Sequence, residues 1–165
     1  MNPLFILSGM KYHLNIGTNL GERESNLRSA IYSIETSTKC VAEVSSFIET
    51  DAWGFNSENK FLNVAVAVDC HIEPFAMLDL LQRIEQSLGS SSHRNEDGSY
   101  KDRVVDIDII AVDEMIINTD SLIIPHPRMH LREFVLKPLA ELAPSWKHPV
   151  LQKNATQLLK ELCKK

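Results

Sequence analysis

The sequence predicts an α+β fold with a ferredoxin-like βαββαβ core, extended by a C-terminal hairpin and helices. Two observations lead to this prediction. Hydrophobic patterns typical of strands and helices follow each other in the order strand, helix, strand, strand, helix, strand. The 165 residues, 44% of them hydrophobic, contain no internal repeat, low-complexity tract or linker. We therefore expect one domain over residues 1–165, with its core at about 11–145 and an irregular extension at 1–10.

The first strand and the first helix follow from two clear periods. Tyr12, Leu14 and Ile16 alternate with polar residues, which is the period of a strand. A helix is expected next, because apolar residues recur at the spacing i, i+3, i+4, i+7: Leu27, Ala30, Ile31 and Ile34. A second strand is expected at about 41–49, and a long loop with two large aromatic residues at 50–59.

The next three elements are a buried strand, a helix and a polar loop. The nearly continuous apolar run at 61–68 is typical of a central strand buried on both faces, although Asn63 interrupts it. Pro74 suits the first turn of a helix, whose buried side is a stripe of four residues: Met77, Leu81, Ile84 and Leu88. Gly89 ends this helix, and the polar segment 90–102 is interpreted as a mobile loop.

Two carboxylates mark the strand expected at 103–110. Apolar residues alternate there with Asp106 and Asp108, so both carboxylates share one face, with Cα atoms about 6–7 Å apart. A ferredoxin-like order would place this strand beside the first one, at the centre of the sheet. Paired acids can form the wet face of a half-exposed strand, but acids on a central strand need a partner. Mg²⁺ is such a partner, and it usually also binds substrate phosphates.

The C-terminal part is expected to begin with a hairpin. A tight turn at 113–114 would bring residues 115–117 against the strand at 103–110. Two prolines then restrict the backbone on either side of His126. The other expected elements are an apolar segment at 122–124, another at 134–136, a helix at 139–143 and a last short helix with Asn154 and Gln157 as its capping pair.

Composition and charge argue against several classes of partner. A net charge of −5 and a pI near 5.7 disfavour non-specific nucleic-acid binding. The apolar run at 4–7 is too short to span a bilayer and lacks the features of a signal peptide. Three scattered cysteines without metal-ligand or redox spacing indicate reduced thiols. We expect a cytoplasmic protein that acts on small molecules as a monomer or weak dimer.

The chain holds candidates for each part of a phosphoryl-transfer site, which needs metal ligands, cations and an acceptor pocket. Asp106 and Asp108 would hold the metal. Arg103, His126 and Arg132 would bind phosphates, although a lone arginine is often only a surface charge. The candidates for the acceptor pocket are Gly17, Trp53, Phe61, Asn63 and Phe134. Each has a simpler explanation too, because aromatic residues pack in cores, an amide can bond to backbone and a glycine can serve a turn.

Five motifs occur in order, at 16–21, 61–66, 83–85, 103–109 and 124–127, the last followed by Arg132, Phe134, Val135, Leu136, Pro138 and Leu139. Together they closely resemble the 6-hydroxymethyl-7,8-dihydropterin pyrophosphokinase family of folate biosynthesis. The resemblance runs from about Tyr12 to Pro144. It implies a Mg²⁺-dependent transfer of pyrophosphate from ATP to the hydroxymethyl group of a reduced pterin, with release of AMP.

The resemblance also implies roles for individual residues. Asp106 and Asp108 would hold two Mg²⁺ ions, and Arg103 would act with them on the phosphates. Asn63 would read the edge of the pterin and Phe134 would stack on its ring. The residues that match the pterin pocket are Gly17, Thr50, Trp53, Phe61, Asn63 and Phe134. The residues that match the ATP side are Gln82, Glu85, Arg94, Arg103, Ile109, His126 and Arg132.

The loop at 90–102 departs from the family pattern. The family usually has two arginines in an R-x-R pattern after the glycine that ends the helix, whereas Gly89 is followed by serines, a histidine and Arg94. We expect an active pyrophosphokinase with a variant lid, in which Arg94 or Lys101 takes part of the role of these arginines. The alternatives are a diverged nucleotidyl- or phosphotransferase on the same scaffold and a non-catalytic ligand-binding domain.

Overall fold

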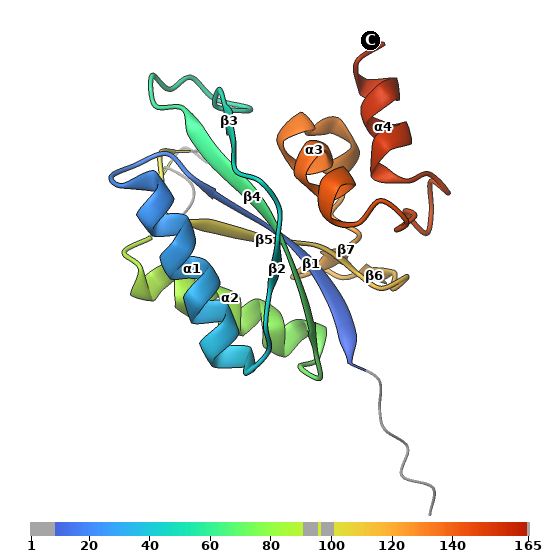
Figure 1. Cartoon of the computed structure of the whole chain (residues 1–165), viewed down its shortest axis with the longest axis horizontal. Helices are drawn as coiled ribbons and strands as arrows, with labels where there is room; N and C mark the ends of the chain where they lie inside the picture. The colour runs from blue at the N-terminus through green and yellow to red at the C-terminus, as the bar shows by residue number, and fades with distance from the viewer. Residues whose placement is uncertain (1–8, 91–95, 97–100, 165) are drawn as a thin grey trace, which may run out of the picture.

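An antiparallel sheet lies at the centre of the computed structural model, which describes residues 9–90, 96 and 101–164 (Figure 1). Its strands are β1 (Met10–Thr18), β2 (Glu43–Val44), β3 (Ile48–Thr50), β4 (Phe61–Cys70) and β5 (Asp106–Val112). Their order is β2-β4-β1-β5, and β3 also pairs with β4. Sheet and helices together confirm an α+β fold. The extension expected at 1–10 lies outside the described residues except at its end, where β1 already begins.

Four α-helices flank the sheet within the described part of the chain. They are α1 (Arg23–Thr38), α2 (Pro74–Ser87), α3 (Glu133–Leu142) and α4 (Ala155–Leu162). The pair α1 and α2 covers one face of the sheet, and α3 and α4 lie together on the other side (Figure 1). None of these described helices is long and apolar enough to cross a membrane.

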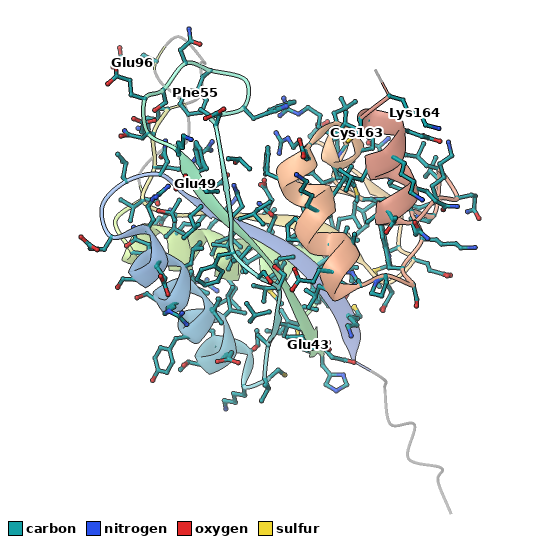
Figure 2. The ribbon with its side chains drawn as sticks, turned by 45° about the horizontal axis from the view of Figure 1, so that its top comes forward. Glu43, Glu49, Phe55, Glu96, Cys163 and Lys164 are labelled. Carbon is teal, nitrogen blue, oxygen red and sulfur yellow. The ribbon has the colours of Figure 1, made fainter. Side chains whose placement is uncertain are left out.

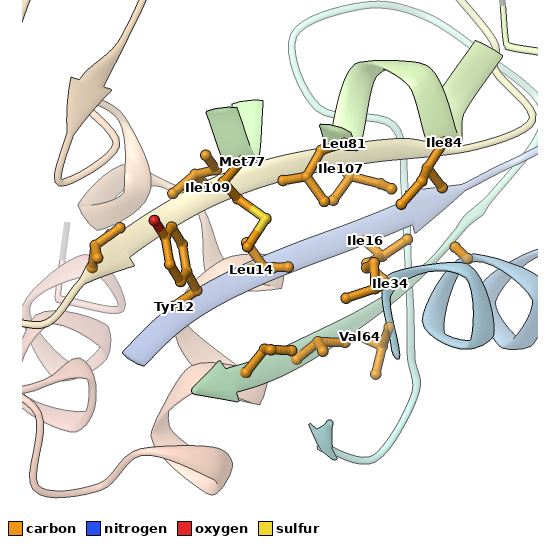
Figure 3. Close-up of a cluster of buried hydrophobic side chains, with 14 of the residues drawn as sticks. Tyr12, Leu14, Ile16, Ile34, Val64, Met77, Leu81, Ile84, Ile107 and Ile109 are labelled. Atoms are coloured by element: carbon orange, nitrogen blue, oxygen red, sulfur yellow. The ribbon is translucent and has the colours of Figure 1, made fainter. Parts of the chain in front are cut away.

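The alternation of side chains along β1 separates an apolar face from a polar one. Tyr12, Leu14 and Ile16 are at most 1% exposed and pack in the core with α1 and α2, as Figure 3 shows. The intervening His13 and Asn15 belong to the opposite face, where the ring of His13 lies 6.0 Å from that of Trp146. The same alternation places the two aspartates of β5 on this polar face.

β5 lies at the edge of the sheet and pairs only with β1 among the described strands. The prediction that it is central was wrong, because in this order only β4 and β1 have a strand on each side. Other groups satisfy its outer edge: the Glu85 carboxylate accepts from Ile107 N–H at 2.5 Å, the Ser90 hydroxyl from Val105 N–H at 2.8 Å and the Ile110 carbonyl from His126 N–H at 2.8 Å. These contacts close the edge to further strand pairing at those positions.

Glu85→Ala is expected to lower the free energy of unfolding by about 1–3 kcal/mol, because it leaves the buried N–H of Ile107 without this acceptor. Glu85 is only 5% exposed, so water cannot readily replace it. Glu85→Gln keeps an acceptor oxygen and should lose less. Urea unfolding measures both, with the exposed Gln82→Ala as a control expected to stay within about 0.5 kcal/mol of wild type. Wild-type stability in Glu85→Ala would show that the contact contributes nothing.

Two strand predictions need correction. The strand expected at 41–49 is split into β2 and β3, because Ser45 between them uses its hydroxyl to accept from Ala65 N–H at 2.9 Å. Residues 115–117 do not form a hairpin with β5. Instead β6 (Ile117–Asn118) pairs with β7 (Ile123–Ile124), since the turn that reverses the chain lies between these two short strands.

The C-terminal helices are longer or more regular than predicted. The apolar segments at 134–136 and 139–143 belong to one helix, α3, which tolerates Pro138 and is preceded by a 3-10 helix, η1 (Met129–Leu131). The capping pair at the start of α4 is confirmed: the Asn154 side chain accepts from Gln157 N–H, and the Gln157 side chain accepts from Asn154 N–H. Each bond satisfies a backbone donor that the helix itself leaves unpaired.

His13 is buried on the polar face of β1. It is 4% exposed, and neither ring nitrogen has a hydrogen-bond partner among the described residues. Burial, followed by the charge of Lys11, lowers the pKa of His13 from 6.5 to about 4. The ring is therefore neutral near pH 7 in the folded protein, and the unfolded chain takes up a proton more readily.

We expect acid to destabilise the protein through His13. A pKa that is lower in the folded state gives stability that is fully present above about pH 6.5 and is lost as the pH falls towards about 4. The shift corresponds to a loss of about 2 kcal/mol between about pH 7 and about pH 5. His13→Phe keeps a ring near Trp146 but binds no proton. Its free energy of unfolding, measured with denaturant, should therefore fall by about 2 kcal/mol less than that of wild type over this pH range.

The matched control for this prediction is His71→Phe, because His71 is exposed. Its loss of stability between the two pH values should equal that of wild type. The role of His13 is contradicted if His13→Phe and wild type lose the same free energy of unfolding over this range.

Candidate active site

Residues from three strands form a row across the polar face of the sheet. Asn63 of β4, Gly17 of β1 and Asp106 of β5 lie opposite one another, and Asn15 and Asp108 are paired in the next row. Gly17 leaves the floor between Asn63 and Asp106 open. A Cβ atom on Gly17 would lie 2.8 Å from Asn63 Oδ1, closer than side chains normally approach. The glycine therefore serves a close approach, not a turn.

These rows are the floor of a cleft that also receives side chains from the β3–β4 loop and from the segment after β7. The predicted site residues that line it are Gly17, Thr50, Trp53, Phe61, Asn63, Arg103, Asp106, Asp108, His126, Arg132 and Phe134. Residues that are 40 or more positions apart in sequence are thus brought together, so the predicted metal, phosphate and acceptor groups share one cleft.

Three of the predicted residues that the structure describes do not line this cleft. Gln82 is exposed on α2, and Glu85 is buried against the outer edge of β5. Ile109 lies on the other face of β5, in the core with α2. Arg94 lies outside the described residues.

Three lining residues were not predicted: Asn15, Asp51 and Arg128. Asn15 shares the two-residue period of β1 with Gly17, and this period could have identified it. Arg128 follows directly on the motif at 124–127, and Asp51 lies inside the loop expected at 50–59, but nothing in their spacing marks them as part of the cleft.

Each aspartate of the pair has an arginine partner. Arg103 Nη1 lies 3.2 Å from Asp106 Oδ2, and Arg132 Nη1 lies 3.6 Å from Asp108 Oδ2. The arginine side chains are 11% and 7% exposed, so these contacts are poorly screened by solvent. The carboxylates are therefore compensated without a metal, and their mere presence on the sheet does not demand one.

Hydrogen bonds connect Asp102 and Arg103, at the end of the loop before β5, to the β3–β4 loop and to Asn19. Asp102 accepts hydrogen bonds from Ser57, Asn19 and Asn59 at 2.6–2.8 Å. The bond from Ser57, with smaller effects of Asn19, Asn59 and Arg103, lowers the pKa of the Asp102 carboxyl. Asn19 Oδ1 also accepts from Arg103 N–H at 2.8 Å, so the backbone of Arg103 is held in place at the cleft.

Aromatic rings and arginines alternate along one wall of the cleft. The rings of Trp53 and Phe134 meet edge to face, with centroids 6.5 Å apart. The guanidinium of Arg132 lies 4.5 Å from the Trp53 ring and 5.6 Å from the Phe134 ring, and that of Arg128 lies 5.7 Å from Trp53. Such contacts are attractive in a desolvated site, so they hold Arg132 near Asp108.

Phe61 forms a second aromatic contact at the start of β4. Its ring lies 5.4 Å from the guanidinium of Arg103 and 6.1 Å from the ring of Phe55, edge to face. Figure 2 shows Phe55 at the end of the molecule opposite Glu43, on the long loop that follows Glu49. The loop therefore contributes aromatic surface at the cleft end of the sheet.

Asn63 presents an amide at the floor of the cleft. It is 2% exposed, and its Nδ2 donates to Thr50 Oγ1 at 3.1 Å. Thr50 thus uses one of the two Nδ2 protons and fixes the orientation of the amide. The other polar positions of Asn63 are available to a flat ligand that offers matching donors and acceptors.

His126 places a neutral imidazole ring in the cleft. Its Nδ1 accepts from the backbone N–H of Arg128 at 3.1 Å, which places the ring proton on Nε2. Burial, followed by the charges of Arg132 and Arg128, lowers the pKa of His126 from 6.5 to about 4. The ring can therefore donate a hydrogen bond to a phosphate oxygen without carrying a charge at pH 7.

The two carboxylates of the cleft suit Mg²⁺ better than a metal ion whose ligands all come from protein side chains. Within the described residues there is no group of three or more His, Cys, Asp or Glu that could hold a metal. Mg²⁺ is usually bound by one or two carboxylates, with water and substrate phosphates completing its octahedron. Asp106 and Asp108 provide two such oxygen ligands on one side of β5, within the cleft.

Comparison with known proteins identifies relatives over most of the chain. A family model for 7,8-dihydro-6-hydroxymethylpterin-pyrophosphokinase matches residues 13–144. The 2-amino-4-hydroxy-6-hydroxymethyldihydropteridine pyrophosphokinase of Porphyromonas gingivalis is 39% identical over 138 residues, which are 83% of this chain and 92% of the relative. The protein of the same name from Bacillus subtilis is 40% identical over 131 residues, covering 79% and 76%.

Solved structures share the fold. Wild-type Plasmodium falciparum HPPK-DHPS with pteroate has a TM-score of 0.71 at 14% sequence identity, over 93% of this chain and 44% of that one. This chain therefore spans less than half of that protein. An HPPK-DHPS in complex with substrates has a TM-score of 0.72, also at 14% identity and 44% of its length. From the family model and the two curated relatives, this chain belongs to the 7,8-dihydro-6-hydroxymethylpterin-pyrophosphokinase family.

Proposed function

We propose that the cleft transfers pyrophosphate from ATP to the hydroxymethyl group of 6-hydroxymethyl-7,8-dihydropterin and releases AMP. The observation that carries the proposal is the row formed by Asn63, Gly17 and Asp106 across three adjacent strands. A flat ring bound at Asn63 would extend over Gly17 towards the carboxylates. This orientation would bring the hydroxyl of the ligand close to the phosphates, which is a large part of catalysis in such reactions.

The pterin side of the cleft would consist of Gly17, Thr50, Trp53, Phe61, Asn63 and Phe134. Asn63, oriented by Thr50, would read the polar edge of the ring. The aromatic wall of Trp53 and Phe134 would stack on its face. A ligand with a flat, polar-edged ring suits this combination better than an aliphatic acceptor does.

The phosphates would lie between the carboxylates and the later loop. Arg103 and Arg132 supply positive charge, and neutral His126 supplies a hydrogen-bond donor. The family resemblance implies that Gln82, Ile109 and a lid residue, Arg94 or Lys101, complete the ATP side. Gln82 and Ile109 would do so from α2 and the far face of β5, beyond the lining of the cleft. Glu85 would act through β5, whose backbone it holds at Ile107.

Asp106 and Asp108 would hold two Mg²⁺ ions, which when bound neutralise phosphate charge and favour ionisation of the attacking hydroxyl. The arginine partners keep both carboxylates oriented before substrate arrives. They would then share their charge with the phosphates, since a guanidinium has more than one donor edge. The aromatic wall would exclude water from the acceptor side once the pterin is bound.

The wider assignments belong to the same proposal. The order β2-β4-β1-β5 supports a ferredoxin-like sheet, with β2 and β3 together as its second strand. We infer one domain over residues 1–165 with its core at about 11–145. A cytoplasmic monomer or weak dimer that uses ATP and a reduced pterin as its small-molecule partners fits this architecture.

Incubation with 6-hydroxymethyl-7,8-dihydropterin and Mg²⁺-ATP tests the function. The expected products are AMP and the pterin pyrophosphate, separated by ion-exchange chromatography. Release of pyrophosphate would instead indicate a nucleotidyltransferase. Pterin binding without any nucleotide turnover would indicate a non-catalytic ligand-binding domain.

A further inference from the structure

Asn15 is a buried polar residue in the floor of the cleft that no part of the proposed function uses. It is 5% exposed, and its Oδ1 has no hydrogen-bond partner in the part of the chain that the structure describes. A buried amide oxygen without a partner destabilises a fold. An apolar side chain of the same size would suit the sheet better, so the amide points to a partner that arrives with the ligand.

The position of Asn15 limits what that partner can be. On β1 it lies opposite Asp108 of β5 and opposite Ala65 of β4. The side chain of Ala65 is short, so it fills little of the cleft on the β4 side of Asn15. Asn63 is its diagonal neighbour, with Cα atoms about 7–8 Å apart in an antiparallel pair. Gly17 contributes no side chain between the two amides. The Asn15 amide thus stands between Asn63 and the Asp108 carboxylate.

We propose that Asn15 is a second pterin-binding residue, whose Oδ1 accepts a hydrogen bond from an N–H donor of the bound ring. This inference rests on the proposed function. Asn63 holds one edge of the ring, and Asn15 fixes its rotation about that anchor. Two amides at separate points determine the orientation of a flat ring, whereas one amide and stacking leave it free to turn. The hydroxyl is then directed at Asp108.

The test compares Asn15→Leu and Asn15→Ala with wild type in equilibrium binding of 6-hydroxymethyl-7,8-dihydropterin, with Mg²⁺ and a non-hydrolysable ATP analogue. We expect the pterin Kd to rise about 10-fold or more in both variants, as for loss of a ligand hydrogen bond in a desolvated site. The melting temperature of Asn15→Leu should be equal to or above that of wild type. In turnover, the KM for pterin should rise more than kcat falls.

The control is Asn118→Ala, because Asn118 is exposed on β6, away from the cleft lining. Its pterin Kd should equal that of wild type. An unchanged pterin Kd in both Asn15 variants would overturn the inference, even if their Mg²⁺ requirement changed. A lower melting temperature in both variants, matching the loss of binding, would also overturn it in favour of a structural amide. Failure of the wild type itself to bind pterin would refute the proposed function and this inference with it.

Discussion

Asp106→Asn and Asp108→Asn are each expected to lower the rate of AMP formation by about 1,000-fold. Each substitution keeps the size of the side chain and removes one of the two carboxylates that we propose as Mg²⁺ ligands. A loss of about 4 kcal/mol of transition-state stabilisation corresponds to this factor, and metal-ion catalysis contributes several kcal/mol. The measurement is AMP released per minute at saturating pterin and ATP, over a series of Mg²⁺ concentrations.

The arginine contacts make this prediction more specific. Asp106→Asn removes the carboxylate that lies 3.2 Å from Arg103, and Asp108→Asn removes the one that lies 3.6 Å from Arg132. We therefore expect a moderate fall in melting temperature as well, and the rate must be measured well below it. Asp120→Asn is the control, because Asp120 is exposed and does not line the cleft. Retention of half the wild-type rate with an unchanged Mg²⁺ dependence in either cleft variant would refute the metal assignment.

The faces of β1 and β5 could be predicted from sequence, because a two-residue period is a local property of the chain. Tyr12 and Leu14 were expected opposite His13, and the structure confirms it. For the same reason Asp106 and Asp108 share a face. The neighbours of a strand depend on contacts distant in sequence, which no period records. The pairing of β5 with β1 was predicted correctly, but its edge position was missed.

Contacts between a side chain and a backbone group distant in sequence could not be predicted either, unlike the local capping pair of α4. Glu85 has the spacing of a residue beside the buried stripe of α2, which suits a solvent-exposed position. In the structure its carboxylate accepts a hydrogen bond from Ile107 N–H, on the edge of β5 where no further strand pairs among the described residues. The partnership of Asp108 with Arg132 depends on how α3 docks on the sheet. The family resemblance placed Glu85 and Arg132 on the ATP side, but only the structure shows which groups they contact.

Gly17→Ala is expected to weaken pterin binding by about 10- to 100-fold while leaving the fold intact. The new methyl group would lie 2.8 Å from Asn63 Oδ1 and 3.6 Å from Phe61 Cδ1. Asn63 must then move, and it would lose its bond to Thr50 or its place in the cleft. Gly17 has no positive φ, so alanine fits the backbone, and glycine inside a strand is otherwise unfavourable. The melting temperature should change by only a few degrees.

A double-mutant cycle with Asn63→Ala tests whether the methyl group of Gly17→Ala acts through its clash with the Asn63 amide or in another way. Asn63→Ala alone should weaken pterin binding, because it removes the amide that reads the ring. In that background the methyl group of Gly17→Ala no longer meets an amide oxygen. Adding Gly17→Ala to Asn63→Ala should therefore raise the pterin Kd by less than about 3-fold. Equal losses from Gly17→Ala in both backgrounds would show that the methyl group meets the ligand directly. A wild-type Kd in Gly17→Ala would remove Gly17 from the binding surface and with it the path from Asn63 to the carboxylates.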